Sequence, residues 1–205
     1  MNFLNRLIKR GLFVLLFVFN ILHSNFTFAQ QPLTISLFNE STSIPYTTFF
    51  NSPVHPGIQA GTEFQWKQGQ HFALYPTVNV GYMFHKNLFQ GLYMNIELAF
   101  DVKTNFGLNF KSRLGLGYLR TFNTQQEYGF TGNGYKPSSD KGNSRLMPSF
   151  TLGLGYNLKT SDLSSPEVFV LYKSWIEYPY SPGFIPLMSH SDVHLGVKLY
   201  PFKNP

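Results

Sequence analysis

The feature of this sequence that most limits its fold is an alternation of apolar and polar residues that continues through unusually long segments. The cleanest one, residues 90–102, sets Leu92, Met94, Ile96, Leu98, Phe100 and Val102 against Gly91, Tyr93, Asn95, Glu97 and Asp101. A period of two indicates a β-strand, because successive side chains of a strand point to opposite faces. The segments run for about 10 to 16 residues, whereas strands of globular proteins centre on about 5 to 6 and strands that cross a membrane need about 9 to 11.

Eight segments carry this pattern, some less cleanly than others: residues 33–39, 57–67, 71–85, 90–102, 105–121, 145–158, 167–178 and 188–202. After residue 30 no apolar stretch approaches the length of a membrane-spanning helix, so only a closed barrel satisfies every backbone group inside a membrane. The predicted turns 67–70, 103–105 and 159–166 are short. The connections at the other end are 45–54, 86–89, 122–144 and 179–187, of which only 86–89 is tight. The sequence therefore predicts an all-β, closed antiparallel transmembrane β-barrel of eight strands, with both chain ends on the side of the short turns.

Glycines and aromatic residues support a barrel over a soluble sandwich. Nine glycines fall on the polar parity of the strands: Gly61, Gly81, Gly91, Gly107, Gly115, Gly117, Gly153, Gly155 and Gly196. In a small barrel this parity faces a crowded and strongly curved interior, where residues without side-chain volume are useful. Aromatic residues make up 18% of the chain. Those near the strand ends on the apolar parity fit the aromatic girdles of membrane barrels, and they are Trp66, Tyr82, Tyr118, Tyr156 and Tyr178.

The first 29 residues have the composition of a cleaved signal peptide. Arg6, Lys9 and Arg10 precede an apolar run, and Thr27-Phe28-Ala29 supplies the small residues before a cleavage site. We therefore expect residues 1–29 to be removed and residues 30–205 to form the barrel domain. The segment contains three basic and no acidic residues, so the formal charge falls from +6 to about +3 in the mature chain. Export and scattered basic residues argue against nucleic acid as a partner.

Two prolines argue against the predicted strands in which they fall. Pro76 and Pro148 both fall inside alternating segments. A closed barrel has no free edge at which a missing backbone donor is harmless, so each proline requires a bulge or a place at the rim. Pro148 is predicted near a rim, whereas nothing in the sequence accounts for Pro76.

Charged residues on the polar parity are the first candidates for a functional role. Glu63, Lys67, Glu97, Asp101, Lys111 and Arg113 are predicted to face the interior, where neighbouring strands bring opposite charges together. An eight-stranded barrel is just wide enough for side chains to fill it, so these residues predict a salt-bridged lumen. A gated or narrow pore is the alternative for the same charges.

The last strand carries a second set of candidates. His190, Asp192 and His194 share one face, with about 6.8 Å between successive positions, so two of them and a ligand from a neighbouring strand could bind a transition metal. An inward polar row is the alternative, and no cofactor is predicted. Ser189, His190, Ser191 and Glu177 suggest a serine hydrolase, but neighbouring strand residues point to opposite faces, so no catalytic residue is assigned.

Two connections are candidates for recognition. Residues 121–144 are rich in Gly, Asn, Ser and Lys and contain Tyr128, Phe130 and Tyr135. Recognition of a partner and a loop without function are equal alternatives for this connection. Residues 178–186 contain three prolines, which predict a stiff loop. Tyr180, Phe184 and Ile185 of this loop are the predicted contacts to a partner.

The final strand, His194-Leu-Gly-Val-Lys-Leu-Tyr-Pro-Phe202, together with the pattern over residues 33–202, resembles the small outer-membrane β-barrel proteins of Gram-negative bacteria. In that family such a strand is an assembly signal for the outer-membrane insertion machinery; here Lys203, Asn204 and Pro205 follow the aromatic. The resemblance implies lipid and lipopolysaccharide as surroundings. The family includes structural barrels, adhesion proteins, narrow channels and a few lipid-modifying enzymes. The leading hypothesis is a non-enzymatic structural or accessory barrel that joins a larger outer-membrane complex; the alternatives are a narrow pore and a lipid A acyl hydrolase.

Overall fold

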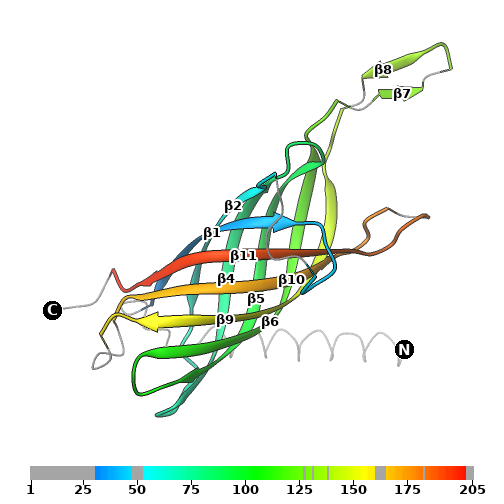
Figure 1. The fold of residues 1–205 in the computed structure, drawn as a ribbon. Helices are drawn as coiled ribbons and strands as arrows, with labels where there is room; N and C mark the ends of the chain where they lie inside the picture. Colours follow the sequence, from blue (N-terminus) through cyan, green and yellow to red (C-terminus); the bar gives the residue numbers. More distant parts are fainter. Residues whose placement is uncertain are drawn as a thin grey trace, which may run out of the picture. The chain divides into compact units, whose positions relative to one another are not determined.

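The structure, a computed structural model, describes residues 31–47, 53–126, 128–130, 132–137, 139–159, 165–181 and 183–201. The predicted signal peptide, residues 1–29, lies outside them. Within the described residues, eight strands form one closed antiparallel sheet (Figure 1). These strands are β1 (Leu33–Ser41), β2 (Pro56–Glu63), β4 (Phe72–Phe84), β5 (Phe89–Lys103), β6 (Leu108–Asn123), β9 (Asn143–Asn157), β10 (Glu167–Glu177) and β11 (Met188–Leu199).

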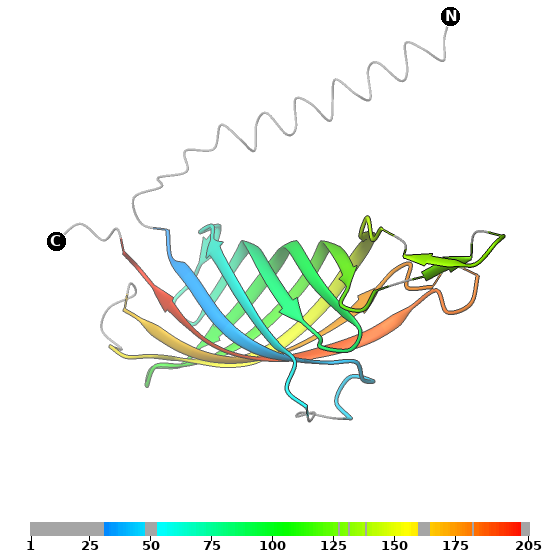
Figure 2. The same ribbon diagram turned by 90° about the horizontal axis from the view of Figure 1, so that it is seen from above.

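Each barrel strand pairs with the barrel strands before and after it in the chain, and β1 closes the ring by pairing with β11 from Leu33↔Leu199 to Ser41↔Ser191 (Figure 2). This arrangement confirms the predicted fold class. Three short strands are additional: β3 (Lys67–Gln68) pairs with β4, and β7 (Tyr128–Phe130) pairs with β8 (Tyr135–Pro137) in a hairpin between β6 and β9. The part of the chain that the structure describes contains no helix that is long and apolar enough to span a membrane.

The connections fall at two ends of the barrel. We call the end at which β1 begins and β11 ends the terminal end; its connections are 64–71, 104–107 and 158–166. The opposite end, the far end, carries 42–55, 85–88, 124–142 and 178–187. The longest connection, 124–142, lies at the far end, and 85–88 is the tight exception there, as the sequence predicts.

The outer face of the sheet carries apolar side chains and the inner face carries polar ones, as the alternation predicts. Along β5 the exposed side chains are apolar, from Leu92 to Val102, while Asn95, Glu97 and Asp101 between them are buried. The predicted girdle residues Trp66, Tyr82, Tyr118, Tyr156 and Tyr178 are all exposed. The apolar parity therefore covers the outside of the barrel and the polar parity fills its interior, the reverse of a soluble protein.

Close backbone approach explains two of the interior glycines. A Cβ atom on Gly153 would lie 2.4 Å from the carbonyl oxygen of Val170, and one on Gly196 would lie 2.6 Å from the carbonyl oxygen of Ile35. Backbone oxygens of a neighbouring strand cannot move aside cheaply, so strong curvature at these points requires glycine.

Pro76 lies opposite an interruption of the neighbouring strand. Glu63 pairs with Thr77, but Lys67 pairs with Leu74, so one extra residue is accommodated between β2 and β3. The carbonyl of Pro76 accepts a hydrogen bond from the Phe64 amide (2.9 Å), and the proline nitrogen points to the same side. The missing donor therefore faces a bulge, which is where a strand tolerates proline.

Pro148 lies beside a second interruption. The ladder between β9 and β10 runs to Ser149↔Trp175, and only the isolated pair Leu146↔Tyr178 continues it. Pro148 falls between these pairs, towards the far end of β9. This position agrees with the predicted place near a rim.

Candidate functional site

Eight charged side chains form a continuous chain of ion pairs in the interior. Lys111 Nζ lies 2.7 Å from Asp101 Oδ2 and 2.8 Å from Glu167 Oε1. Lys198 Nζ lies 3.2 Å from the second oxygen of Glu167 and 2.8 Å from Glu63 Oε2. Arg113 then joins Glu63 (3.8 Å) to Glu97 (3.6 Å). Lys173 completes the chain at 3.1 Å from Glu97. Acids and bases alternate along it, four of each, so the chain is electrically neutral.

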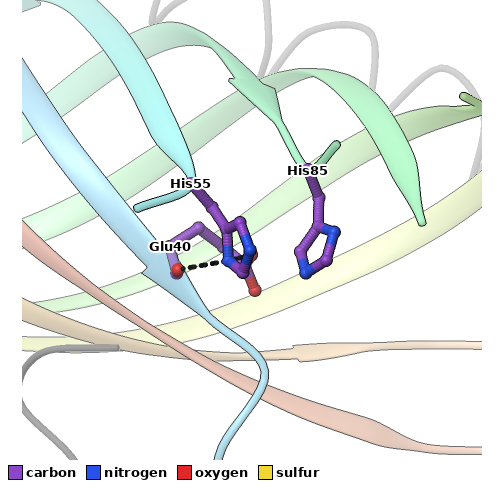
Figure 3. Close-up of side chains that lie close together, drawn as sticks. All are labelled: Glu40, His55 and His85. Carbon is purple, nitrogen blue, oxygen red and sulfur yellow. Dashed lines mark hydrogen bonds and ion pairs between the residues drawn. The ribbon is translucent and has the colours of Figure 1, made fainter. Parts of the chain in front are cut away.

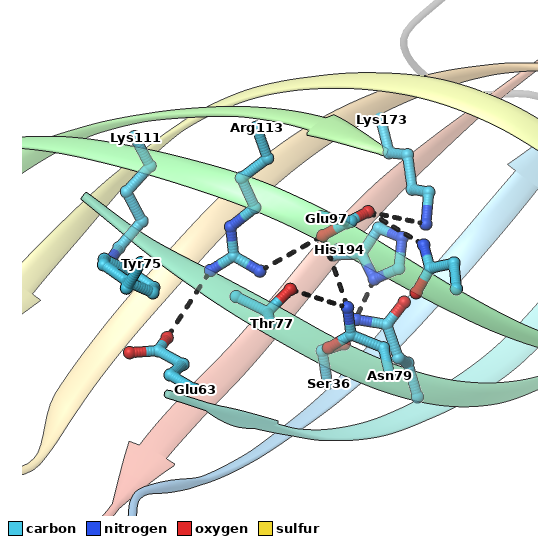
Figure 4. A network of polar contacts seen from close by, with 12 residues as sticks. Ser36, Glu63, Tyr75, Thr77, Asn79, Glu97, Lys111, Arg113, Lys173 and His194 are labelled. Atoms are coloured by element: carbon cyan, nitrogen blue, oxygen red, sulfur yellow. Dashed lines mark hydrogen bonds and ion pairs between the residues drawn. The ribbon is translucent and has the colours of Figure 1, made fainter. Parts of the chain in front are cut away.

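Glu97 is the most connected member of this ion-pair chain (Figure 4). Besides Arg113 and Lys173, it accepts hydrogen bonds from Asn79 Nδ2 (3.3 Å) and Asn95 Nδ2 (2.9 Å). Its residue exposure is 2%. A buried carboxylate needs such partners, because removing it from water without them costs several kcal/mol.

Lys67 is a correction to the predicted lumen set. The structure brings Glu63, Glu97, Asp101, Lys111 and Arg113 together, but Lys67 lies exposed on β3. The bulge at residues 64–66 shifts the parity of the chain, so a position counted as inward before the bulge leaves the interior after it. Three members that complete the ion-pair chain are not among the predicted residues: Glu167, Lys173 and Lys198. They lie on β10 and β11, where the alternation is less regular.

A second polar cluster occupies the far end. His190 lies between two carboxylates: Nδ1 is 2.8 Å from Glu40 Oε1, and Nε2 is 3.3 Å from Glu177 Oε2. The Trp175 ring stacks on the His190 ring with centroids 4.0 Å apart. Glu177 in turn pairs with Arg145 Nε at 3.1 Å. This arrangement fixes both the position and the orientation of the Glu40 side chain.

Glu40 on β1, His55 just before β2 and His85 just after β4 form one row (Figure 3). The β1–β2 register, with Asn39↔Pro56, places Glu40 opposite His55, and the Glu40 amide donates to the His55 carbonyl at 2.9 Å. The β2–β4 register, with Gly57↔Met83, places His55 opposite His85 two residues further on. The two imidazole rings lie with centroids 3.5 Å apart. One ligand atom from each residue of this row lies within 4.8 Å of the others.

The surroundings of His85 favour its neutral form. Glu40 and His55 are buried, and His85 is half-buried in the connection after β4. Burial lowers the pKa of His85 below its usual value, and the neighbouring His55 lowers it further. A neutral imidazole is the form that binds metal ions.

The residues predicted on the last strand all line the interior, but they point to different partners. His190 contacts Glu40 and Glu177, whereas His194 Nε2 lies 3.7 Å from Asp192 Oδ2. Asp192 also accepts a hydrogen bond from Trp175 Nε1 at 3.0 Å. Ser191 Oγ lies 2.7 Å from Ser43 Oγ, so this hydroxyl is engaged away from His190.

The predicted partner loop has a defined internal structure. The amides of Tyr180 and Ser181 donate to the carbonyls of Pro186 (2.9 Å) and Ile185 (2.8 Å). Arg145 donates to the carbonyls of Pro179 and Tyr180 and lies over the Tyr180 ring. Phe184 projects into solvent with 83% of its surface exposed, and Ile185 is 38% exposed. The loop therefore presents apolar side chains on a hydrogen-bonded frame.

The sequence matches no protein-family model and no curated protein. Among solved structures, the chain is similar to Neisserial surface protein A, with a TM-score of 0.57 and 10% identity over 84% of this chain and 97% of that one. Weaker likenesses are to Ail of Yersinia pestis (TM-score 0.48, 9% identity, 82% and 96% covered) and to the outer membrane enzyme PagL (0.47, 10%, 82% and 99%).

The chain has the fold of the small eight-stranded outer-membrane β-barrels. The family resemblance drawn from the sequence is thereby confirmed as a likeness of fold. Proteins of different function share this architecture, so the function follows from the side chains described above.

Proposed function

We propose that this chain is an integral, non-enzymatic protein of the Gram-negative outer membrane, where its closed barrel serves as a structural or accessory subunit of a larger complex. The neutral chain of ion pairs across the interior carries this proposal. Its charges are committed to one another, and side chains from β2, β5, β6, β10 and β11 meet in the lumen. A lumen filled in this way supports a scaffold over the alternative of a narrow pore.

The hydrolase alternative receives less support from the geometry. Serine-dependent acyl transfer needs a histidine that accepts the serine proton. Here the ring nitrogens of His190 lie 2.8 Å and 3.3 Å from the carboxylates of Glu40 and Glu177. The predicted Ser191 hydroxyl contacts Ser43 instead.

The filled lumen predicts a barrel that does not conduct. Purified protein refolded into planar lipid bilayers is expected to show no discrete channel openings at applied voltages of either sign. An established porin, added to the same bilayers, verifies that openings would be detected. Reproducible openings that disappear when the protein is heat-denatured would favour the pore and contradict a permanently filled lumen.

The accessory role predicts that the loop 178–187 binds a partner. Changing the exposed Phe184 and Ile185 to serine is expected to reduce partner recovery at least tenfold when the protein is purified from its own membranes in mild detergent. Two buried apolar side chains contribute about 1.5–3 kcal/mol each, and 1.4 kcal/mol corresponds to a tenfold change in affinity. Recovery is measured by quantitative mass spectrometry.

The matched control for this experiment is Phe106→Ser. Phe106 is also exposed (64%) but lies in the connection 104–107 at the terminal end. The Phe106→Ser variant should leave partner recovery unchanged. Both this variant and the loop variant should keep the difference in gel mobility between heated and unheated samples. Equal recovery of the same proteins with the loop variant and the wild type would exclude this loop as the docking surface.

A further inference from the structure

We infer that Glu40, His55 and His85 form a binding site for one divalent transition-metal ion, with zinc as the best match, at the far end of the barrel. Two imidazoles and one carboxylate are a ligand set that zinc prefers, and three protein ligands leave a fourth position open. The residues belong to three consecutive barrel segments: β1, the residue preceding β2, and the residue following β4. None of them takes part in the neutral ion-pair chain.

The two oxygens of Glu40 are in different situations. Oε1 accepts hydrogen bonds from Thr42 Oγ1 (3.2 Å) and contacts His190 Nδ1 (2.8 Å). Oε2 is buried, and among the described atoms it has no hydrogen-bond partner. His55 Nδ1 lies 3.7 Å from this oxygen. A buried carboxylate oxygen left without a partner is costly, and one turned towards two imidazoles is placed to bind a cation.

The second contacts of the ligands resemble those of a metal site. His55 Nδ1 lies 3.2 Å from the Glu40 carbonyl oxygen. When Nδ1 carries the proton and donates it there, Nε2 keeps its lone pair for a metal. Histidine ligands usually donate their other ring N–H to a carbonyl or carboxylate in this way. For the Glu40 ligand, the second contact is with His190, whose other ring nitrogen contacts Glu177.

The spacing of the ligand atoms allows coordination after a small adjustment. They lie within 4.8 Å of one another. Ligands of a tetrahedral zinc ion, at bond lengths of about 2.0–2.1 Å, are separated by about 3.3 Å. Because His85 is half-buried in a connection, an ion can reach the row from that side.

The excess of carboxylates at the far end also favours the binding of a cation. Glu40, Glu177 and Asp192 are buried there, and among the described residues one guanidinium, that of Arg145, pairs with this group, at Glu177. Apart from the imidazoles, carboxylates are therefore in excess there, unlike in the balanced ion-pair chain. The excess is compensated either by protons on the imidazoles or by a metal ion, and a titration with Zn²⁺ distinguishes the two.

The experiment uses the untagged, refolded, metal-free barrel titrated with Zn²⁺ in a calorimeter at pH 7.5. We expect one ion per chain, and His85→Ala or His55→Ala should weaken binding at least tenfold. His71→Ala is the matched control, because His71 is an exposed histidine at the terminal end, and it should leave the affinity unchanged. Each variant is first shown to keep the heat-dependent gel shift of a closed barrel.

A spectroscopic measurement on the wild-type protein does not depend on the variants. Co²⁺ bound by these three ligands should give the strong visible absorption of a four-coordinate ion, which Zn²⁺ displaces. Absence of Zn²⁺ binding to the wild type, binding that survives both His55→Ala and His85→Ala, or only the weak bands of six-coordinate Co²⁺ would each overturn the site. In the first case, protons compensate the carboxylates.

Discussion

Replacing Glu97 by alanine is expected to destabilise the barrel by about 3–5 kcal/mol, the usual cost of removing one partner of a buried ion pair. The variant leaves the ammonium group of Lys173 in the interior without its carboxylate, and Arg113 with only the more distant Glu63. Asn79 and Asn95 also lose an acceptor. Urea unfolding in lipid vesicles, followed by tryptophan fluorescence, measures the change, because Trp175 is buried inside the barrel.

Two further variants test whether the cost comes from the interior charges. Lys67→Ala removes an exposed lysine and should change the stability by no more than about 0.5 kcal/mol. Glu97→Ala combined with Lys173→Ala restores neutrality, so the double variant should be less destabilised than the sum of the two single variants. A Glu97→Ala effect as small as that of Lys67→Ala would mean that water screens the lumen charges.

The strands and their inward faces could be predicted from the sequence because both depend on local alternation. Along most of β5 and β6 more buried and more exposed positions alternate, and the predicted inward charges Glu97, Asp101, Lys111 and Arg113 all lie in the interior. Alternation no longer predicts which side chains point inward where a bulge shifts the inward and outward positions by one residue. The bulge that accommodates Pro76 moves Lys67 out of the lumen, and the position of a bulge depends on the partner strand, which the sequence alone does not reveal.

The histidine row at the far end depends on register between strands, so local patterns could not reveal it. Glu40 and His55 are separated by a long connection, and its length leaves the pairing of β1 with β2 undetermined. Once the register Asn39↔Pro56 is known, the contact of Glu40 with His55 follows directly. The sequence predicts metal-ligand candidates on the last strand, at His190, Asp192 and His194. The ligand atoms that converge come instead from β1, the residue before β2 and the residue after β4.

Replacing Ile96 by arginine is expected to destabilise the protein in lipid vesicles by about 2–4 kcal/mol, the cost of an arginine on the lipid-facing side of a barrel near the bilayer midplane. Ile96 lies at the middle of β5, is 61% exposed, and pairs with the apolar Val78 on β4 and Leu116 on β6. On the surface of a soluble protein, an arginine here would be solvated and would cost no more than about 0.5 kcal/mol. The size of the effect therefore tells which solvent the outer face contacts.

Phe106→Arg is the matched control for Ile96→Arg. Phe106 has a similar exposure (64%) but lies in the connection 104–107, where a charge near the membrane–water interface costs about 0–1 kcal/mol. Both variants are compared by urea unfolding in the same vesicles. A large difference between them places the middle of β5 in hydrocarbon, because the two residues differ in depth and hardly in exposure. Equal and small effects would show that water reaches the whole apolar face, and the proposed membrane location would then be wrong.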